Sequence, residues 1–103
     1  MKKRKMGVNE LKKYEGIFIT KSALNDEIAK KLLAQIEVEI SKNGGSIDKI
    51  ENWGKKGLAY SIKKNKEGVY YKVDFTITPD KISNLKDTYR LNEDILKVVV
   101  IKK

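Results

Sequence analysis

The stretch Trp53-Gly54-Lys55-Lys56-Gly57-Leu58-Ala59-Tyr60-Ser61-Ile62 joins a tight turn, a cationic bend and an alternating strand. Leu58, Tyr60 and Ile62 recur with the two-residue period that places side chains on one face of a strand. Its two glycines bracket two lysines, and glycine inside a strand pattern marks a bulge or a close approach of another backbone. We therefore predict a bent strand with one face available for burial and the other left open.

Residues 53–64 contain four lysines and no acidic residue. RNA phosphates attract cations that have no neutralising partner, and RNA bases stack on aromatic side chains such as Tyr60. The same lysines could instead only protect an edge strand from pairing with other chains. On these residues alone both interpretations stay open.

Composition favours a polyanionic partner. The chain has 103 residues, enough for one domain, and its 23 basic and 14 acidic residues give a formal charge of +9. The excess lies in residues 1–13, with six basic residues and one acidic, and in residues 53–64. Residues 14–52 are mildly acidic. This asymmetry indicates one basic surface beside a more neutral one.

The N-terminal segment, residues 1–12, is polar and has no sustained apolar period. Lys2, Lys3, Arg4 and Lys5 are consecutive in it. We expect a flexible basic arm that orders on RNA, followed by a single domain over residues 13–103. The alternative is a solvated tail that makes no contact.

The first half of this domain predicts a strand, a helix and a second strand. Residues 13–20 are rich in aromatic and branched side chains, as strands are. Asn25 is a helix N-cap, and the helix that follows it ends at the Asn43-Gly44-Gly45 signal. The second strand starts at Ser46 and continues through the bent stretch, with a break in period near Gly54.

The second half predicts a strand, a helix and a last strand. Residues 64–68 are expected to connect the two strands of a hairpin, and residues 69–77 alternate cleanly between apolar and polar side chains. Thr78-Pro79-Asp80 starts a helix that ends near Arg90, and residues 95–101 form the final strand. The order β-α-β-β-α-β predicts an α+β, ferredoxin-like fold, with a four-stranded antiparallel sheet and both helices on one face.

Catalysis and metal binding have little support. The chain has no cysteine and no histidine, which removes the common nucleophile, general base and metal ligands. We expect no enzyme activity, no cofactor and no small-molecule substrate. No run approaches eighteen apolar residues, so we expect a cytoplasmic protein without a membrane contact.

One alternative uses the same topology. Residues 66–75 fall on the strand where RNA-recognition-motif proteins have their stacking aromatics, but Val69 follows Gly68 and Tyr71 lies on the expected core face. A free single-stranded nucleic-acid or messenger-binding regulator with such a sheet is therefore the second candidate.

The landmarks from Tyr14 to Ile101 resemble the sixth protein of the bacterial small ribosomal subunit. The resemblance rests on the following segments: Lys13-Tyr14-Glu15, Asn43-Gly44-Gly45, Trp53-Gly54-Lys55-Lys56, Leu58-Ala59-Tyr60 with Ile62, and Arg90-Leu91-Asn92-Glu93-Asp94-Ile95-Leu96. Gly57 and Ser61 depart from the family pattern. The resemblance implies a non-catalytic ribosomal protein that binds the central domain of small-subunit ribosomal RNA together with the eighteenth small-subunit protein.

Two sets of contact residues follow. The first strand sends Tyr14 and Phe18 to one face and Ile17 and Ile19 to the other, and we expect the aromatic pair inside and the two isoleucines facing the partner protein. The alternative is that neighbouring side chains cover the isoleucines. The expected RNA contacts are Lys2, Lys3, Arg4, Lys5, Lys12, Lys13, Lys55, Lys56, Tyr60, Lys63, Lys64 and Arg90.

Overall fold

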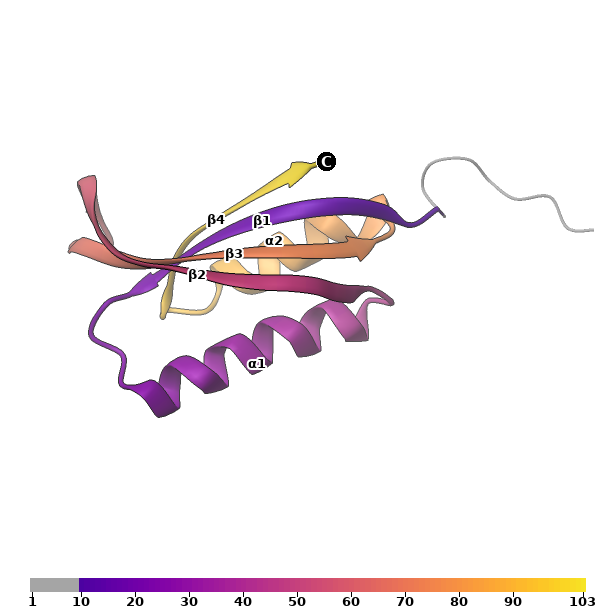
Figure 1. The fold of residues 1–103 in the computed structure, drawn as a ribbon. Coiled ribbons are helices and arrows are strands. Elements are labelled where there is room, and N and C mark those ends of the chain that lie inside the picture. The colour runs from indigo at the N-terminus through magenta and orange to yellow at the C-terminus, as the bar shows by residue number, and fades with distance from the viewer. Residues whose placement is uncertain (1–9) are drawn as a thin grey trace, which may run out of the picture.

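The computed structural model describes residues 10–103. Figure 1 shows four strands in one antiparallel sheet together with two helices. The strands are β1 (Lys12–Lys21), β2 (Ser46–Ile62), β3 (Asn65–Ile77) and β4 (Ile95–Lys102), and the helices are α1 (Asp26–Lys42) and α2 (Ile82–Arg90). The sheet order is β2-β3-β1-β4. The predicted ferredoxin-like α+β fold is confirmed.

A single core lies between the sheet and the two helices. Alternate residues of β3, namely Tyr71, Val73, Phe75 and Ile77, are buried against α1 and α2 together with Phe18. On α1 the buried stripe is Leu32, Ile36 and Ile40, at the four-residue spacing of one helix face. Because both helices bury side chains in this one cluster, the opposite face of the sheet stays open.

The first strand is oriented as predicted but is covered more than expected. Tyr14 and Phe18 are buried in the core. Ile17 is half-buried on the open face, whereas Ile19 is only 7% exposed, so the expectation that both isoleucines are exposed is wrong for Ile19. Ile19 packs beside Gly68, where a Cβ atom would lie 2.5 Å from the Ile19 Cγ2 atom. The absence of that side chain lets Ile19 lie close against β3.

The hairpin connection differs from the prediction. The turn consists of Lys63 and Lys64, and residues 65–68 already belong to β3. Both lysines have positive φ, 50° and 68°, as in the two-residue type I′ turn that suits a hairpin twist. Such turns normally contain Asn or Gly, which is why two lysines did not indicate one. The Asn65 side chain donates a hydrogen bond to the Lys63 carbonyl oxygen at 2.9 Å.

The glycine bulge in β2 is confirmed. The register with β3 shifts between Asn52 and Gly54, and Gly54 has a φ of 86°. The Asn52 side chain accepts a hydrogen bond from the Gly54 N–H at 2.7 Å. A second register shift lies between Gly57 and Ile62. Bulges bend a strand, and Figure 1 shows the end of β2 rising away from α1.

Both helices begin and end close to the predicted residues. The Asn25 side chain caps α1 by accepting a hydrogen bond from the Ile28 N–H at 2.8 Å. The segment after Thr78 opens as a 3₁₀ turn, Pro79–Lys81, before α2 starts. Thr78 makes no side-chain capping bond, so only its position at the boundary was predicted correctly.

Candidate nucleic-acid interface

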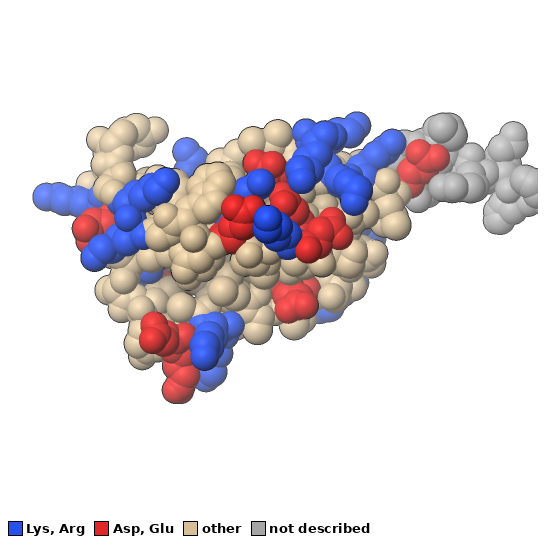
Figure 2. Space-filling view, viewed as in Figure 1, with Lys and Arg blue, Asp and Glu red and all other residues tan. Residues whose placement is uncertain are grey.

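The predicted RNA-contacting cations lie at two separate ends of the sheet. Lys12 pairs with Ile77 at one end of β1, whereas Lys21 pairs with Gly68 at the other. Ten strand residues span about 30 Å, so Lys12 and Lys13 are far from the hairpin. Figure 2 shows basic side chains at both ends and mixed charges between them. Lys2, Lys3, Arg4 and Lys5 lie outside the described residues.

The hairpin end holds the bent lysine pair. Lys56 is exposed, and its Nζ atom lies 5.6 Å from the centre of the Trp53 ring and 5.5 Å from that of Tyr70. At these distances the two rings attract the Lys56 ammonium group by cation–π interaction, which holds it in place and does not neutralise its charge. The Lys55 Nζ atom is 3.9 Å from a Glu67 carboxylate oxygen, so Lys55 is partly neutralised. Lys56 therefore retains more of its positive charge than Lys55 does.

The turn lysines extend this end toward β4. Lys64 is exposed, and the Lys63 Nζ atom donates a hydrogen bond to the Ile95 carbonyl oxygen at 3.2 Å. Lys63 thereby lies beside Arg90, whose Nη1 atom is 3.3 Å from an Asp87 carboxylate oxygen. The structure thus brings together Lys63 and Arg90, two predicted contact residues that are distant in the sequence.

Lys97 joins the same site and was not among the predicted contacts. It lines a surface pocket of about 440 Å³ with Lys63 and Arg90. The available sequence signal was its position as a lone lysine in the otherwise apolar run of residues 95–101. Its pairing with Ile19 across β1 and β4 places it on the open face.

The centre of the open face is not a basic platform. The Lys72 Nζ atom lies 3.7 Å from Glu15, 3.9 Å from Glu51 and 3.8 Å from Asp74, measured to carboxylate oxygens. Hydrogen bonds from Trp53 and Lys49 to the Glu51 carboxylate lower the pKa of Glu51, so it remains charged. Lys103 also pairs with Asp74 at 3.4 Å and Lys49 with Glu51 at 3.4 Å, so three lysines and three carboxylates neutralise one another here. The centre of the face therefore offers phosphate less uncompensated positive charge than the hairpin end does.

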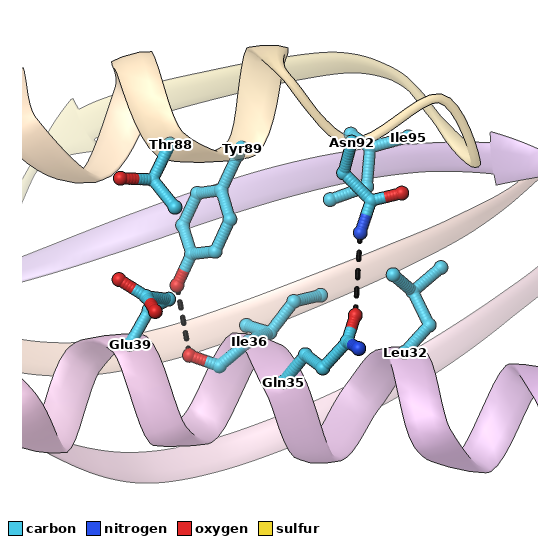
Figure 3. Close-up of a pocket in the computed structure, with 8 residues that line it drawn as sticks. All are labelled: Leu32, Gln35, Ile36, Glu39, Thr88, Tyr89, Asn92 and Ile95. Carbon is cyan, nitrogen blue, oxygen red and sulfur yellow. Dashed lines mark hydrogen bonds between the residues drawn. The ribbon is translucent and has the colours of Figure 1, made fainter.

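A second cavity lies on the other side of the molecule, between the two helices (Figure 3). The Tyr89 hydroxyl donates a hydrogen bond to the Ile36 carbonyl oxygen at 2.8 Å, and the Asn92 amide donates one to the Gln35 side-chain oxygen at 3.3 Å. Burial raises the pKa of Tyr89 well above its ordinary value, so the hydroxyl stays protonated. The first bond connects the two helices and the second connects α1 to the segment that follows α2, so we assign this cavity to helix packing.

No group of three or more residues suited to hold a metal ion occurs within residues 10–103. In the same part of the chain, no helix is long and apolar enough to cross a membrane.

Comparison with known proteins agrees with this architecture. The family model described as "Ribosomal protein S6" matches residues 13–102. The small ribosomal subunit protein bS6 of Chlamydia pneumoniae is 37% identical over 97 residues, which cover 94% of this chain and 87% of that protein. The small ribosomal subunit protein bS6 of Chlamydia abortus is 39% identical over 89 residues, which cover 86% of this chain and 80% of that protein.

A solved structure is similar over the whole fold. The crystal structure of 30S ribosomal protein S6 from Thermotoga maritima superposes with a TM-score of 0.83 at 27% sequence identity, covering 91% of this chain and 89% of that one. The chain therefore belongs to the bacterial ribosomal protein S6 family, and it is a structural protein of the small ribosomal subunit rather than an enzyme.

Proposed function

We propose that the protein binds the central domain of small-subunit ribosomal RNA together with the eighteenth small-subunit protein. Family membership and the resemblance noted above support this assignment. The observation that carries the RNA part is the group of cations at the hairpin end. Within residues 10–103, Lys56, Lys63, Lys64 and Lys97 form no ion pair with a carboxylate, so their charge is available to phosphates.

The alternative, a free regulator that binds single strands on the open sheet face, has less support. The carboxylates around Lys72 occupy the middle of that face. Tyr71, in the segment weighed as a stacking motif, is buried in the core. The middle of the face therefore lacks the aromatic, cationic surface that base stacking across a sheet requires.

The RNA proposal is tested by a salt titration. A fragment of the central domain would be bound in the presence of the eighteenth protein, with binding measured over a range of salt concentrations. Replacing Lys56 with alanine should weaken binding and reduce the salt slope by about one. The additional Lys55→Ala change should add less, because Glu67 already neutralises part of the charge of that lysine. Lys42→Ala, at the opposite end of the sheet on α1, is the matched control. A slope unchanged by the double substitution would contradict the proposal.

For the partner protein we propose a strip of apolar side chains on the open face. Ile17 lies directly opposite Val99, and Glu15 opposite Ile101. Val99 is 38% exposed and Ile101 is 52% exposed. The three apolar side chains adjoin one another on β1 and β4, as contact surfaces for a protein partner do. Ile19 is not part of this strip, because it is already buried.

Two substitutions distinguish a residue that contacts the partner protein from a buried residue that stabilises the fold. Ile17→Thr should weaken binding of the eighteenth protein about fivefold, a loss of about 1 kcal/mol for the apolar contact that is removed, with little change in melting temperature. Ile19→Thr should lower the melting temperature because it places a hydroxyl in a buried site. Val38→Thr, an exposed position on α1, is the control. Unchanged partner binding by the Ile17 variant would refute the proposed strip.

A further inference from the structure

Two surface hollows meet at Lys97. The first, of about 440 Å³, is lined by Lys63, Arg90 and residues 95–98. The second, of about 150 Å³, is lined by Ile19, Tyr70 and the overhanging segment of β2 that includes Tyr60. Lys97 lines both. A ligand that occupies both hollows would therefore pass this ammonium group.

The first hollow is cationic over an apolar floor. Lys63 uses one N–H for the Ile95 carbonyl oxygen and retains two donors. Arg90 contacts Asp87 through Nη1 alone, and most of its five N–H donors remain available. Lys97 has no carboxylate partner within residues 10–103. Apolar walls strengthen the field of such cations, and the group they suit is a phosphate.

A bulge in β4 shapes this hollow. The pairing of β1 with β4 shifts between Ile19 and Thr20, so that Leu96 is an extra residue in β4. Ile95 and Leu96 are consequently both buried, and Lys97 still lies on the open face. Bulges re-aim side chains and leave a backbone group without its strand partner. Here the Ile95 carbonyl oxygen anchors Lys63.

The turn supplies a second sign of function. Lys63 and Lys64 both have positive φ, a conformation that Gly or Asn adopts at lower cost. Strained residues of this kind cluster at binding sites. The geometry of the turn therefore does not account for two lysines, whereas binding of an anion would use their charge.

The second hollow is aromatic and apolar. Tyr60 is 74% exposed, and Tyr70 is half-buried beside Leu58 and Ile62. Tyrosine faces of this kind stack with RNA bases that have left the helix. A tyrosine as exposed as Tyr60 contributes little to the stability of the fold, and its ring is therefore available to stack on a base.

We propose that the two hollows together bind one unpaired nucleotide of RNA, with its phosphate against Lys63, Arg90 and Lys97 and its base against Tyr60 and Tyr70. This inference rests on the proposed RNA-binding function and adds that the protein binds an extruded base as well as the phosphates of the RNA backbone.

The first test uses adenosine 5′-monophosphate, ribose 5-phosphate and inorganic phosphate as separate probes, followed by the amide NMR spectrum of the whole chain. The nucleotide should shift residues of both hollows, whereas the two probes without a base should shift the first hollow alone. An identical response to all three probes, or shifts spread over lysines at both ends of the sheet, would overturn the proposal.

The second test uses the central-domain RNA fragment. Tyr60→Ser should weaken binding by roughly 5- to 150-fold without changing the salt slope, since it removes stacking on one base. Lys97→Met should weaken binding and reduce the slope by about 0.7, the value for a phosphate of a single strand. Lys42→Met is the charge-matched control at the other end of the sheet.

The two proposals can fail separately. Wild-type binding by both variants would overturn the nucleotide site and leave the proposed function intact. Failure of the unaltered protein to bind the central-domain RNA would overturn the proposed function, and the response to adenosine 5′-monophosphate would still decide whether the hollows hold a nucleotide.

Discussion

The hairpin turn offers a direct test of the idea that binding has been favoured over stability. Lys64 has a φ of 68°, in the left-handed region where a Cβ atom is unfavourable. Lys64→Gly removes that steric cost and also removes one cation. We therefore expect a protein that is more stable and binds RNA less tightly.

The magnitude follows from two opposing terms. The left-handed conformation costs an ordinary residue about 1–2 kcal/mol. Glycine lowers this gain by about 0.5–1 kcal/mol because its unfolded chain is more flexible. The net gain lies between about 0 and 1.5 kcal/mol, and its midpoint of about 0.75 kcal/mol corresponds to about 3–4 °C in the melting temperature of a domain of this size.

The matched control is Lys64→Ala, which removes the same charge and keeps the strain. Thermal unfolding of both variants at one ionic strength isolates the backbone effect, because any change in charge repulsion is common to them. Both should weaken binding of central-domain RNA and reduce its salt slope by about one. A glycine variant no more stable than the alanine variant would refute the argument from strain.

Three further predictions concern the core and the helices. Gly68→Ala should lower the free energy of unfolding, measured by urea denaturation, by about 1–3 kcal/mol. The reason is that the new Cβ atom would lie 2.5 Å from Ile19 Cγ2 and 3.0 Å from the Thr20 carbonyl oxygen. Gly57→Ala is the control and should leave the free energy of unfolding unchanged, because no atom lies within 4 Å of its new Cβ. Tyr89→Phe should cost about 1 kcal/mol at neutral pH. Burial raises the pKa of Tyr89 in the folded state, so the stabilisation by its protonated hydroxyl is fully present below pH ~10. Above that pH the free energy of unfolding should fall by about 1.4 kcal/mol per pH unit. Urea denaturation at several pH values should show this fall in the unaltered protein and not in the Tyr89→Phe variant. Asn25→Ala should lower stability by about 1 kcal/mol through loss of the α1 cap, and a thermal shift below 1 °C would contradict it.

Much of the fold could be predicted because its signals are local. The alternation in residues 69–77, the Asn25 cap and the glycine bulge at Gly54 each depend on neighbours in the chain, and each is present in the structure. The turn at Lys63 and Lys64 could not be predicted in this way. Its conformation is imposed by the pairing of β2 with β3, and that pairing overrides the poor turn preference of lysine.

The candidate site was predicted only in part, since charge and proximity are different properties. The lysines at 55, 56, 63 and 64 were identified from a run of one sign, and they do gather at one end of the sheet. Lys12 and Lys13 carry the same charge but lie at the opposite end, because β1 runs the length of the sheet between them and the hairpin. The local signal for Lys97 was its position as a lone lysine in the apolar run of residues 95–101, and that signal does not show which other cations it lies beside.

The sequence by itself determined the order of the elements, the identity of most core residues and the basic character of the protein, because periodicity, caps and charge are properties of short segments. Tertiary structure alone decided that Ile19 is covered and that Lys63, Arg90 and Lys97 share one hollow. These outcomes depend on the register of β1 against β3 and β4, on the bulge at Leu96 and on the bend of β2. Each arises from contacts between residues far apart in the chain, where no local pattern specifies which side chains meet.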